Sequence, residues 1–219
     1  MLKLDPDAKT WIEIPFEDKW IFDKLILSSF LGYKCGPAGV PVPEEGEYIV
    51  RPIVNIGGMS AGAEIRHLSL EDSVTIPPGY FWCEIFEGLH LSIDFEDGKL
   101  KYGAVGHKRE DGLTFDKWEF LDADQVKAIM PQMFQVTKIG KALKYRHKFV
   151  NVEMIGGKVI EVHLRANPNP IGEYKELKVV WEGDDIDLKK WKSEGWEWIP
   201  AEDDSLGHLS TKRLGFLAR

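Results

Sequence analysis

The chain has 219 residues, 43% of them hydrophobic, which is enough for one large domain with its own core. Its formal net charge of -8 at pH 7 argues against a nucleic-acid partner, because non-specific nucleic-acid binding needs clustered Lys and Arg side chains. Two lone cysteines, the lack of a signal-peptide pattern and the lack of any run of about 18 apolar residues predict a cytoplasmic protein without membrane contact.

The first predicted element is an amphipathic helix over residues 19–33 (KWIFDKLILSSFLGY), which should end near Gly32. A turn-rich segment, CGPAGVPVP, follows at 35–43. The run EYIVRPIV at 47–54 predicts a strand, and the small residues of NIGGMSAGA at 55–63 predict a surface loop after it.

The middle of the chain has the pattern of an antiparallel meander. A buried strand is predicted at 80–86 (YFWCEIF), and two further strands at 89–108 are joined at Asp97-Gly98. Residues 122–145 have helical spacing with a break at Pro131, and Asp122 or Asp124 is suited to cap the start. Beyond residue 170 the composition becomes acidic and rich in tryptophan.

A hairpin is predicted at 149–169 by the stretch FVNVEMIGGKVIEVHLRANPN. A two-residue Gly156-Gly157 turn would place Glu153 and Glu161 on opposite faces. A three-residue loop that includes Lys158 instead places Glu153 opposite Glu161 and leaves one uniformly apolar face. That face consists of Val150, Val152, Met154, Ile160, Val162 and Leu164. The alternation therefore predicts the three-residue loop.

The other face of this hairpin collects polar residues: Asn151, Glu153, Glu161, His163 and Arg165. Two directly opposed carboxylates repel each other unless a cation lies between them. Mg²⁺ suits this arrangement, because it is commonly held by one or two carboxylates while water and phosphate oxygens complete its shell. The alternative is an ordinary amphipathic hairpin whose polar face meets water.

Five segments follow one another in order: FDKLILSSFLGYKCGPAGVPVP, IVRPIVNIGGMSAGA, PGYFWCEIFEGLHLSIDFEDG, the basic run HKR at 107–109, and NVEMIGGKVIEVHLR. This order resembles the ATP-grasp superfamily, whose members usually join a carboxylate to an amine or thiol through an acyl phosphate. The resemblance implies an α+β fold with antiparallel sheets, packed helices and a nucleotide cleft between two subdomains. It also implies three parts: an N-terminal extension at 1–19, an ATP-grasp-like domain at 20–175, and a Trp-rich C-terminal appendage at 176–219 packed on it.

The resemblance also implies roles for single residues. Glu153 and Glu161 match metal-binding carboxylates, and His163 stands where the family usually has a metal-binding Asn. Arg51 and Arg165 match basic residues at the phosphates and are the implied catalytic residues. The implied ATP-binding residues form a basic set, a mobile lid and an adenine hinge: Arg51, Lys108, Arg109, Gly57, Gly58, Ser60, Gly62, Glu84, Ile85, Phe86 and Glu87.

The implied function is a ligase that uses ATP and Mg²⁺, with Mn²⁺ as the alternative ion, to join small-molecule carboxylate and amine substrates. Three departures separate the chain from the family pattern: no counterpart of the usual amino-terminal α/β domain, Arg51 in place of Lys, and His163 in place of Asn. They keep open a second interpretation, a non-catalytic nucleotide-binding or interaction module whose Trp-rich tail meets a protein partner. A metal-dependent hydrolase ranks third because no general base is recognisable.

Overall fold

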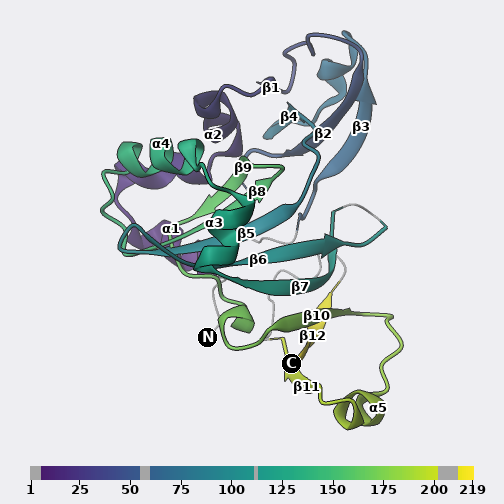
Figure 1. The fold of residues 1–219 in the computed structure, drawn as a ribbon. Coiled ribbons are helices and arrows are strands. Elements are labelled where there is room, and N and C mark those ends of the chain that lie inside the picture. Colours follow the sequence, from purple (N-terminus) through teal and green to yellow (C-terminus); the bar gives the residue numbers. More distant parts are fainter. Residues whose placement is uncertain (1–5, 55–59, 111–112, 202–211) are drawn as a thin grey trace.

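The computed structural model describes residues 6–54, 60–110, 113–201 and 212–219, which form two antiparallel sheets with packed helices (Figure 1). The α-helices are α1 (Pro6–Glu13), α2 (Lys24–Leu31), α3 (Ala123–Ile129), α4 (Phe134–Ala142) and α5 (Leu188–Ser193). Short 3-10 helices are η1 (Phe16–Phe22), η2 (Asp72–Thr75) and η3 (Pro170–Gly172). Among the helices described, none combines the length and apolarity needed to cross a membrane.

The smaller sheet lies at the top of Figure 1 and has the order β1-β4-β2-β3. Its strands are β1 (Cys35–Pro37), β2 (Gly46–Pro52), β3 (Glu64–Leu68) and β4 (Tyr80–Glu84). Alternate residues of β2 and β4 point to opposite faces. Tyr48, Val50 and Trp82 therefore build a small core on one face, and Arg51 and Cys83 remain for the other.

The larger sheet has eight strands in the order β11-β12-β10-β7-β6-β5-β8-β9. They are β5 (His90–Glu96), β6 (Lys99–Lys108), β7 (Phe115–Asp122), β8 (Phe149–Ile155), β9 (Lys158–His163), β10 (Glu176–Trp181), β11 (Glu197–Pro200) and β12 (Arg213–Ala218). The main core lies where α2, α3 and α4 pack on β5, β8 and β9. Fully burying one core side chain such as Ile93 or Met154 stabilises the fold by about 1.5–3 kcal/mol.

The Trp-rich tail extends this larger sheet, because β10 pairs with β7 (bottom of Figure 1). Trp181 and Trp196 are buried. The boundaries drawn at residues 19 and 175, and a protein partner for the tail, stay predictions.

The helices begin and end where local signals place them, with one correction. The single helix predicted over 19–33 is wrong at its start, because Asp23 caps a new helix by accepting a hydrogen bond from the backbone N–H of Ile26. Its predicted end is confirmed by the left-handed Gly32, at φ 84°. The predicted break at Pro131 separates α3 from α4, and Asp122 forms a capping box with Gln125.

The hairpin of β8 and β9 has the predicted pairing but not the predicted loop. Gly156 and Gly157 both have positive φ, 55° and 82°, and Ile155 pairs with Lys158, so the loop has two residues. The three-residue loop is therefore wrong. Glu153 nevertheless pairs with Glu161, and Asn151 with His163, because a β-bulge shifts the register between Glu153 and Met154.

The bulge contributes one extra residue on β9, Ile160, and this corrects the predicted apolar face. Ile160 is only half-buried and lines a pocket on the polar side. Val159 takes its place opposite Met154 and is fully buried in the core. The bulge is thus what allows a two-residue turn and an opposed carboxylate pair in one hairpin.

Candidate active site

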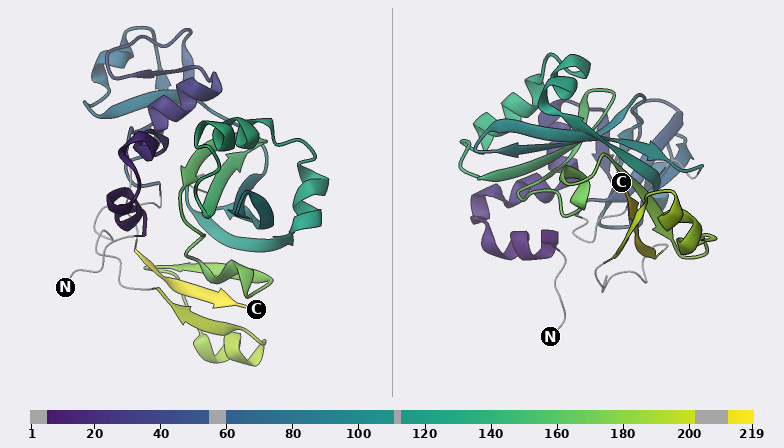
Figure 2. Two further views of the ribbon diagram at one scale, coloured as in Figure 1. Left: turned by 90° about the vertical axis from the view of Figure 1, so that its left-hand side faces the viewer. Right: turned by 60° about the horizontal axis from the view of Figure 1, so that its bottom comes forward.

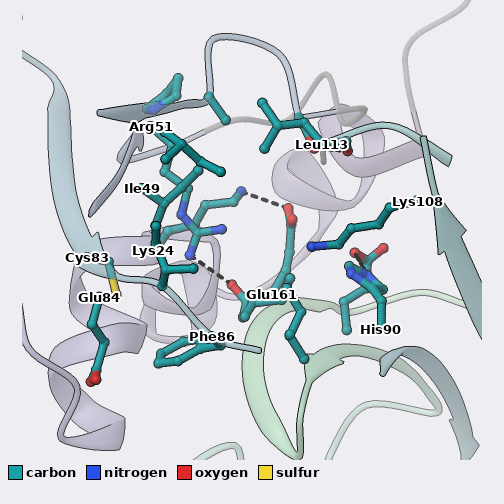
Figure 3. Close-up of a pocket in the computed structure, with 18 of the residues that line it drawn as sticks. Lys24, Ile49, Arg51, Cys83, Glu84, Phe86, His90, Lys108, Leu113 and Glu161 are labelled. Atoms are coloured by element: carbon teal, nitrogen blue, oxygen red, sulfur yellow. Dashed lines mark hydrogen bonds and ion pairs between the residues drawn. The ribbon is translucent and has the colours of Figure 1, made fainter. Parts of the chain in front are cut away.

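A pocket lies between the smaller sheet and the hairpin end of the larger sheet (Figure 3). Eight of the predicted site residues line it: Arg51, Ser60, Glu84, Ile85, Phe86, Lys108, Glu153 and Glu161. Five described ones lie outside its lining: Gly62, Glu87, Arg109, His163 and Arg165. Gly57 and Gly58 lie outside the described residues. Segments far apart in the sequence therefore meet at one place.

Glu161 is paired with a buried lysine, Lys24, that is not among the predicted site residues. The ammonium of Lys24 lies 2.7 Å from Oε1 of Glu161, and the two side chains are 7% and 21% exposed. Lys24 is the first residue of α2, so the Asp23 cap fixes the position from which it reaches β9. The only hint in the sequence is a lysine within the apolar run FDKLIL, and its partner Glu161 lies 137 residues further along the chain.

Glu153 lies between two imidazoles. Nε2 of His90 is 3.3 Å from one carboxylate oxygen, and Nε2 of His163 is 3.8 Å from the other. Burial raises the pKa of the Glu153 carboxyl, but hydrogen bonding and attraction to His163 and His90 outweigh it and hold the pKa well below its usual range. Glu153 is therefore a carboxylate at neutral pH.

The opposite wall of the pocket carries the guanidinium of Arg51. Its Nη2 donates to the carbonyl oxygen of Ile160 at 3.3 Å, and the group lies over the Phe81 ring, 5.4 Å from the centroid. Burial lowers the pKa of Arg51, and the carboxylates of Glu161 and Glu153 oppose this only in part; the group stays charged because the ordinary pKa of arginine is so high. Its buried Nε has no hydrogen-bond acceptor within the described part of the chain. The site thus keeps one unused donor on a cation.

The two basic residues at the end of β6, Lys108 and Arg109, lie in different places. Lys108 lines the pocket, and Figure 3 shows its ammonium and that of Lys24 pointing into the space around the Glu161 carboxylate. Partial burial lowers the pKa of Lys108. Arg109 turns away and pairs with Asp184 at 3.3 Å. Of the two predicted phosphate contacts, only Lys108 lies at the pocket.

The hinge and lid residues are only partly placed at the pocket. Ile85 and Phe86 line it, whereas the Glu84 carboxylate points away in Figure 3 and accepts a hydrogen bond from the backbone N–H of Lys34. Glu87 is exposed and borders a neighbouring hollow. Ser60 lines the pocket while its hydroxyl donates to the carbonyl of Leu113 at 3.0 Å.

His163 and Arg165 are occupied by an aspartate from the N-terminal helix. Asp7 accepts from Nε and Nη2 of Arg165 at 2.8 and 2.6 Å and contacts Nδ1 of His163 at 3.0 Å. Burial lowers the pKa of His163, but Asp7, Glu153 and Glu161 raise it to about 10. Burial raises the pKa of Asp7, but hydrogen bonds and attraction from His163 and Arg165 outweigh it and lower the pKa to about 2.

An imidazolium carries protons on both nitrogens and cannot donate a lone pair to a metal. Over the described ranges, no group of three or more His, Cys, Asp and Glu side chains has a metal-holding geometry. The three-ligand set of Glu153, Glu161 and His163 therefore stays a prediction.

Scanning protein-family models gives no match for this chain, and searching curated proteins gives none either. Solved structures do resemble it. N5-carboxyaminoimidazole synthetase from Staphylococcus aureus, complexed with ADP, has a TM-score of 0.61 at 13% identity, over 91% of this chain and 67% of that one. An L-amino acid ligase from Bacillus licheniformis has a TM-score of 0.64 at 13% identity, over 96% and 70%. A protein assigned to the ATP-grasp superfamily from Archaeoglobus fulgidus has a TM-score of 0.51 at 14% identity, over 91% and 65%.

The chain has the ATP-grasp fold. It spans about two thirds of the length of these three proteins. The predicted α+β class with antiparallel sheets is confirmed: there are two such sheets, and the pocket of this ATP-grasp fold lies between them. At identities of 13–14%, these structural similarities establish the fold alone, so the roles of individual residues rest on the geometry described above.

Proposed function

We propose that the pocket binds ATP with Mg²⁺ and that the protein activates a small-molecule carboxylate as an acyl phosphate, which an amine then attacks. One observation carries this proposal. Arg51 and Lys108 bring cations to the pocket in which Glu153 and Glu161 bring carboxylates, with Ile85 and Phe86 beside them. The phosphates of a nucleotide need the cations, a divalent ion needs the carboxylates, and the adenine ring needs the apolar side chains.

The side chains present fit both groups. The unused Nε donor of Arg51 suits a phosphate oxygen, and Lys108, which lines the same pocket, adds a second cation. Glu153 and Glu161 are opposed across the hairpin, and two carboxylates suffice for Mg²⁺ when water and phosphate oxygens complete the shell. The ion would supply positive charge that offsets the charge of the phosphates.

Two of the structures with this fold support the ligase assignment by what they are named for: one is a synthetase complexed with ADP and the other an L-amino acid ligase. Within this chain, the protein's part would be positioning and charge, so no nucleophilic side chain is required. Arg51 would hold and neutralise phosphate, and Lys24 would fix the Glu161 carboxylate toward the pocket.

A thermal melt tests the proposal. ATP with Mg²⁺ should raise the melting temperature of the purified protein in a concentration-dependent way. The free energy of unfolding should rise by about 2.7 kcal/mol when the ligand concentration is one hundred times the dissociation constant. ATP with a chelator should give a much smaller shift, and Glu161→Ala should lose the Mg²⁺-dependent part relative to its own ligand-free melt. The proposal fails if the unaltered protein shows no shift or if Glu161→Ala shows the same one.

Lys108, the last residue of β6, and Arg109, which follows it, provide a matched pair. Lys108→Met should weaken Mg-ATP binding by about 1.5–3 kcal/mol, because a charge-assisted contact to phosphate is lost. Arg109→Met should leave Mg-ATP binding within error, since Arg109 pairs with Asp184 outside the pocket. Calorimetric titration of both variants measures this, and equal losses would contradict the proposed contact between Lys108 and phosphate.

Release of ADP separates catalysis from binding alone. A ligase should release ADP and phosphate when a carboxylate and an amine are supplied together, whereas a non-catalytic nucleotide-binding module should show the thermal shift without turnover. Screening a small carboxylate set with ammonia or amino acids as acceptors decides between these two functions.

A further inference from the structure

The Asp7 carboxylate is bound as a ligand would be. Arg165 presents two donors in a fork to its two oxygens, and His163 contacts one of them at 3.0 Å. Asp7 is 3% exposed, so the contact is almost dry. A planar guanidinium facing a carboxylate in this way is the usual protein recognition geometry for that group.

The helix that carries Asp7 makes two kinds of contact with the body, through Asp7 and through Trp11, which packs against the main core. Asp7 is the one buried residue of α1, and Ile12 is 65% exposed. Trp11 packs edge-on against Phe22, but a hollow lies between the outer turn of α1 and the body at His147 and Phe149. Figure 2 shows α1 beside the β8–β9 hairpin, where β9 is the edge strand. Within α1, Asp7 is thus the polar contact to the body and Trp11 the apolar one.

This contact lies next to the carboxylate pair of the pocket. Nδ1 of His163 faces Asp7, while its Nε2 lies 3.8 Å from Glu153 and 3.9 Å from Glu161. Only one imidazole thus separates the Asp7 carboxylate from the proposed metal and phosphate region. A bound carboxylate at this place is near where activation of a carboxylate would occur.

We propose that His163 and Arg165 form a binding site for a small-molecule carboxylate, and that Asp7 occupies this site as an internal ligand which the small molecule must displace. The assignment of that small molecule as a substrate rests on the proposed function. The anion site itself does not, because it is defined by contacts that need no nucleotide. Asp7 would thereby keep the site closed until a carboxylate is present.

Acetate tests the site directly, because it reproduces the side chain of aspartate. Asp7→Ala should show a saturable rise in melting temperature with sodium acetate over sodium chloride of equal ionic strength, without nucleotide. The half-saturating acetate concentration should be about tenfold or more lower than in the unaltered protein, as expected if Asp7 occupies the site at least nine-tenths of the time. Glu13→Ala, an exposed carboxylate on the same helix, should respond like the unaltered protein.

The double variant Asp7→Ala/Arg165→Gln should lose the acetate response, since the fork is gone. Equal acetate responses in all variants, or none in Asp7→Ala, would overturn the proposal, and so would a response to inorganic phosphate without one to acetate. Asp7→Asn covers a failure of the alanine variant to fold: its half-saturating acetate concentration should also fall below that of the unaltered protein, and an unchanged value contradicts the site. A failed Mg-ATP melt would sink the proposed function while leaving the acetate result standing.

Discussion

Glu161→Gln should lower the free energy of unfolding by about 3 kcal/mol, because it leaves the buried ammonium of Lys24 without the carboxylate that lies 2.7 Å from it. Lys24→Met should cost less. Glu161 is more exposed than Lys24, and Arg51 and His163 still offset its charge. Urea denaturation of both variants measures the difference.

The double variant Lys24→Met/Glu161→Gln should cost less than the sum of the two single changes, because neither charge is then left buried against a missing partner. Glu44→Gln is the matched control. Its ion pair with Lys34 is also short, 2.8 Å, but the side chains are 58% and 68% exposed, so the change should cost far less than Glu161→Gln. If the losses of unfolding free energy for Lys24→Met and Glu161→Gln are additive, or if Glu44→Gln costs as much as Glu161→Gln, the Lys24–Glu161 pair does not act as a buried ion pair.

The hairpin register was predictable from the sequence because one face had to be buried. Period-two alternation around Val152 and Val162 is enough to bring Glu153 to Glu161. The turn was not predictable in the same way. A bulge at Ile160 changes the count by one residue without changing the pairing beyond it, and alternation alone cannot distinguish a longer loop from a short turn followed by a bulge.

Strand β7 shows a different limit. The strand lies between β6 and β10, and none of its residues, FDKWEFLD, is fully buried. Aromatic and charged side chains occur on both of its faces. The clean alternation that marks a half-buried strand is therefore absent, and the sequence gives no period-two signal there.

The parts of the site that sequence reasoning missed are those formed by distant pairing. Lys24 reaches Glu161, and Asp7 reaches His163 across 156 positions. Each of these residues looks ordinary within its own helix, since a lysine or an aspartate near a helix start has several local explanations. Only the packing of α1 and α2 against the edge strand β9 gives them a charged partner.

Gly156→Ala should destabilise the protein by about 3 kcal/mol or more, because overpacking and backbone strain both act at this turn. A Cβ on Gly156 would overlap the carbonyl oxygen of Glu87, and backbone atoms have little room to give way. Gly156 also donates its N–H to the carbonyl of Leu89 at 3.0 Å. The left-handed φ of 55° adds a cost of about 1–2 kcal/mol for any L-residue with a side chain.

The neighbouring glycine separates these two causes. Gly157 has a φ of 82°, but a Cβ there would meet nothing closer than Cε of Met130 at 3.7 Å, so Gly157→Ala should cost only about 1–2 kcal/mol. Urea denaturation of both variants provides the comparison, and equal costs would refute a close contact between the turn and Glu87. Because residues 85 and 86 line the pocket just before that contact, Gly156→Ala should also weaken Mg-ATP binding, whereas Gly157→Ala should not. The short turn thus does more than connect two strands: it positions the Ile85-Phe86 wall relative to the carboxylates of the same hairpin.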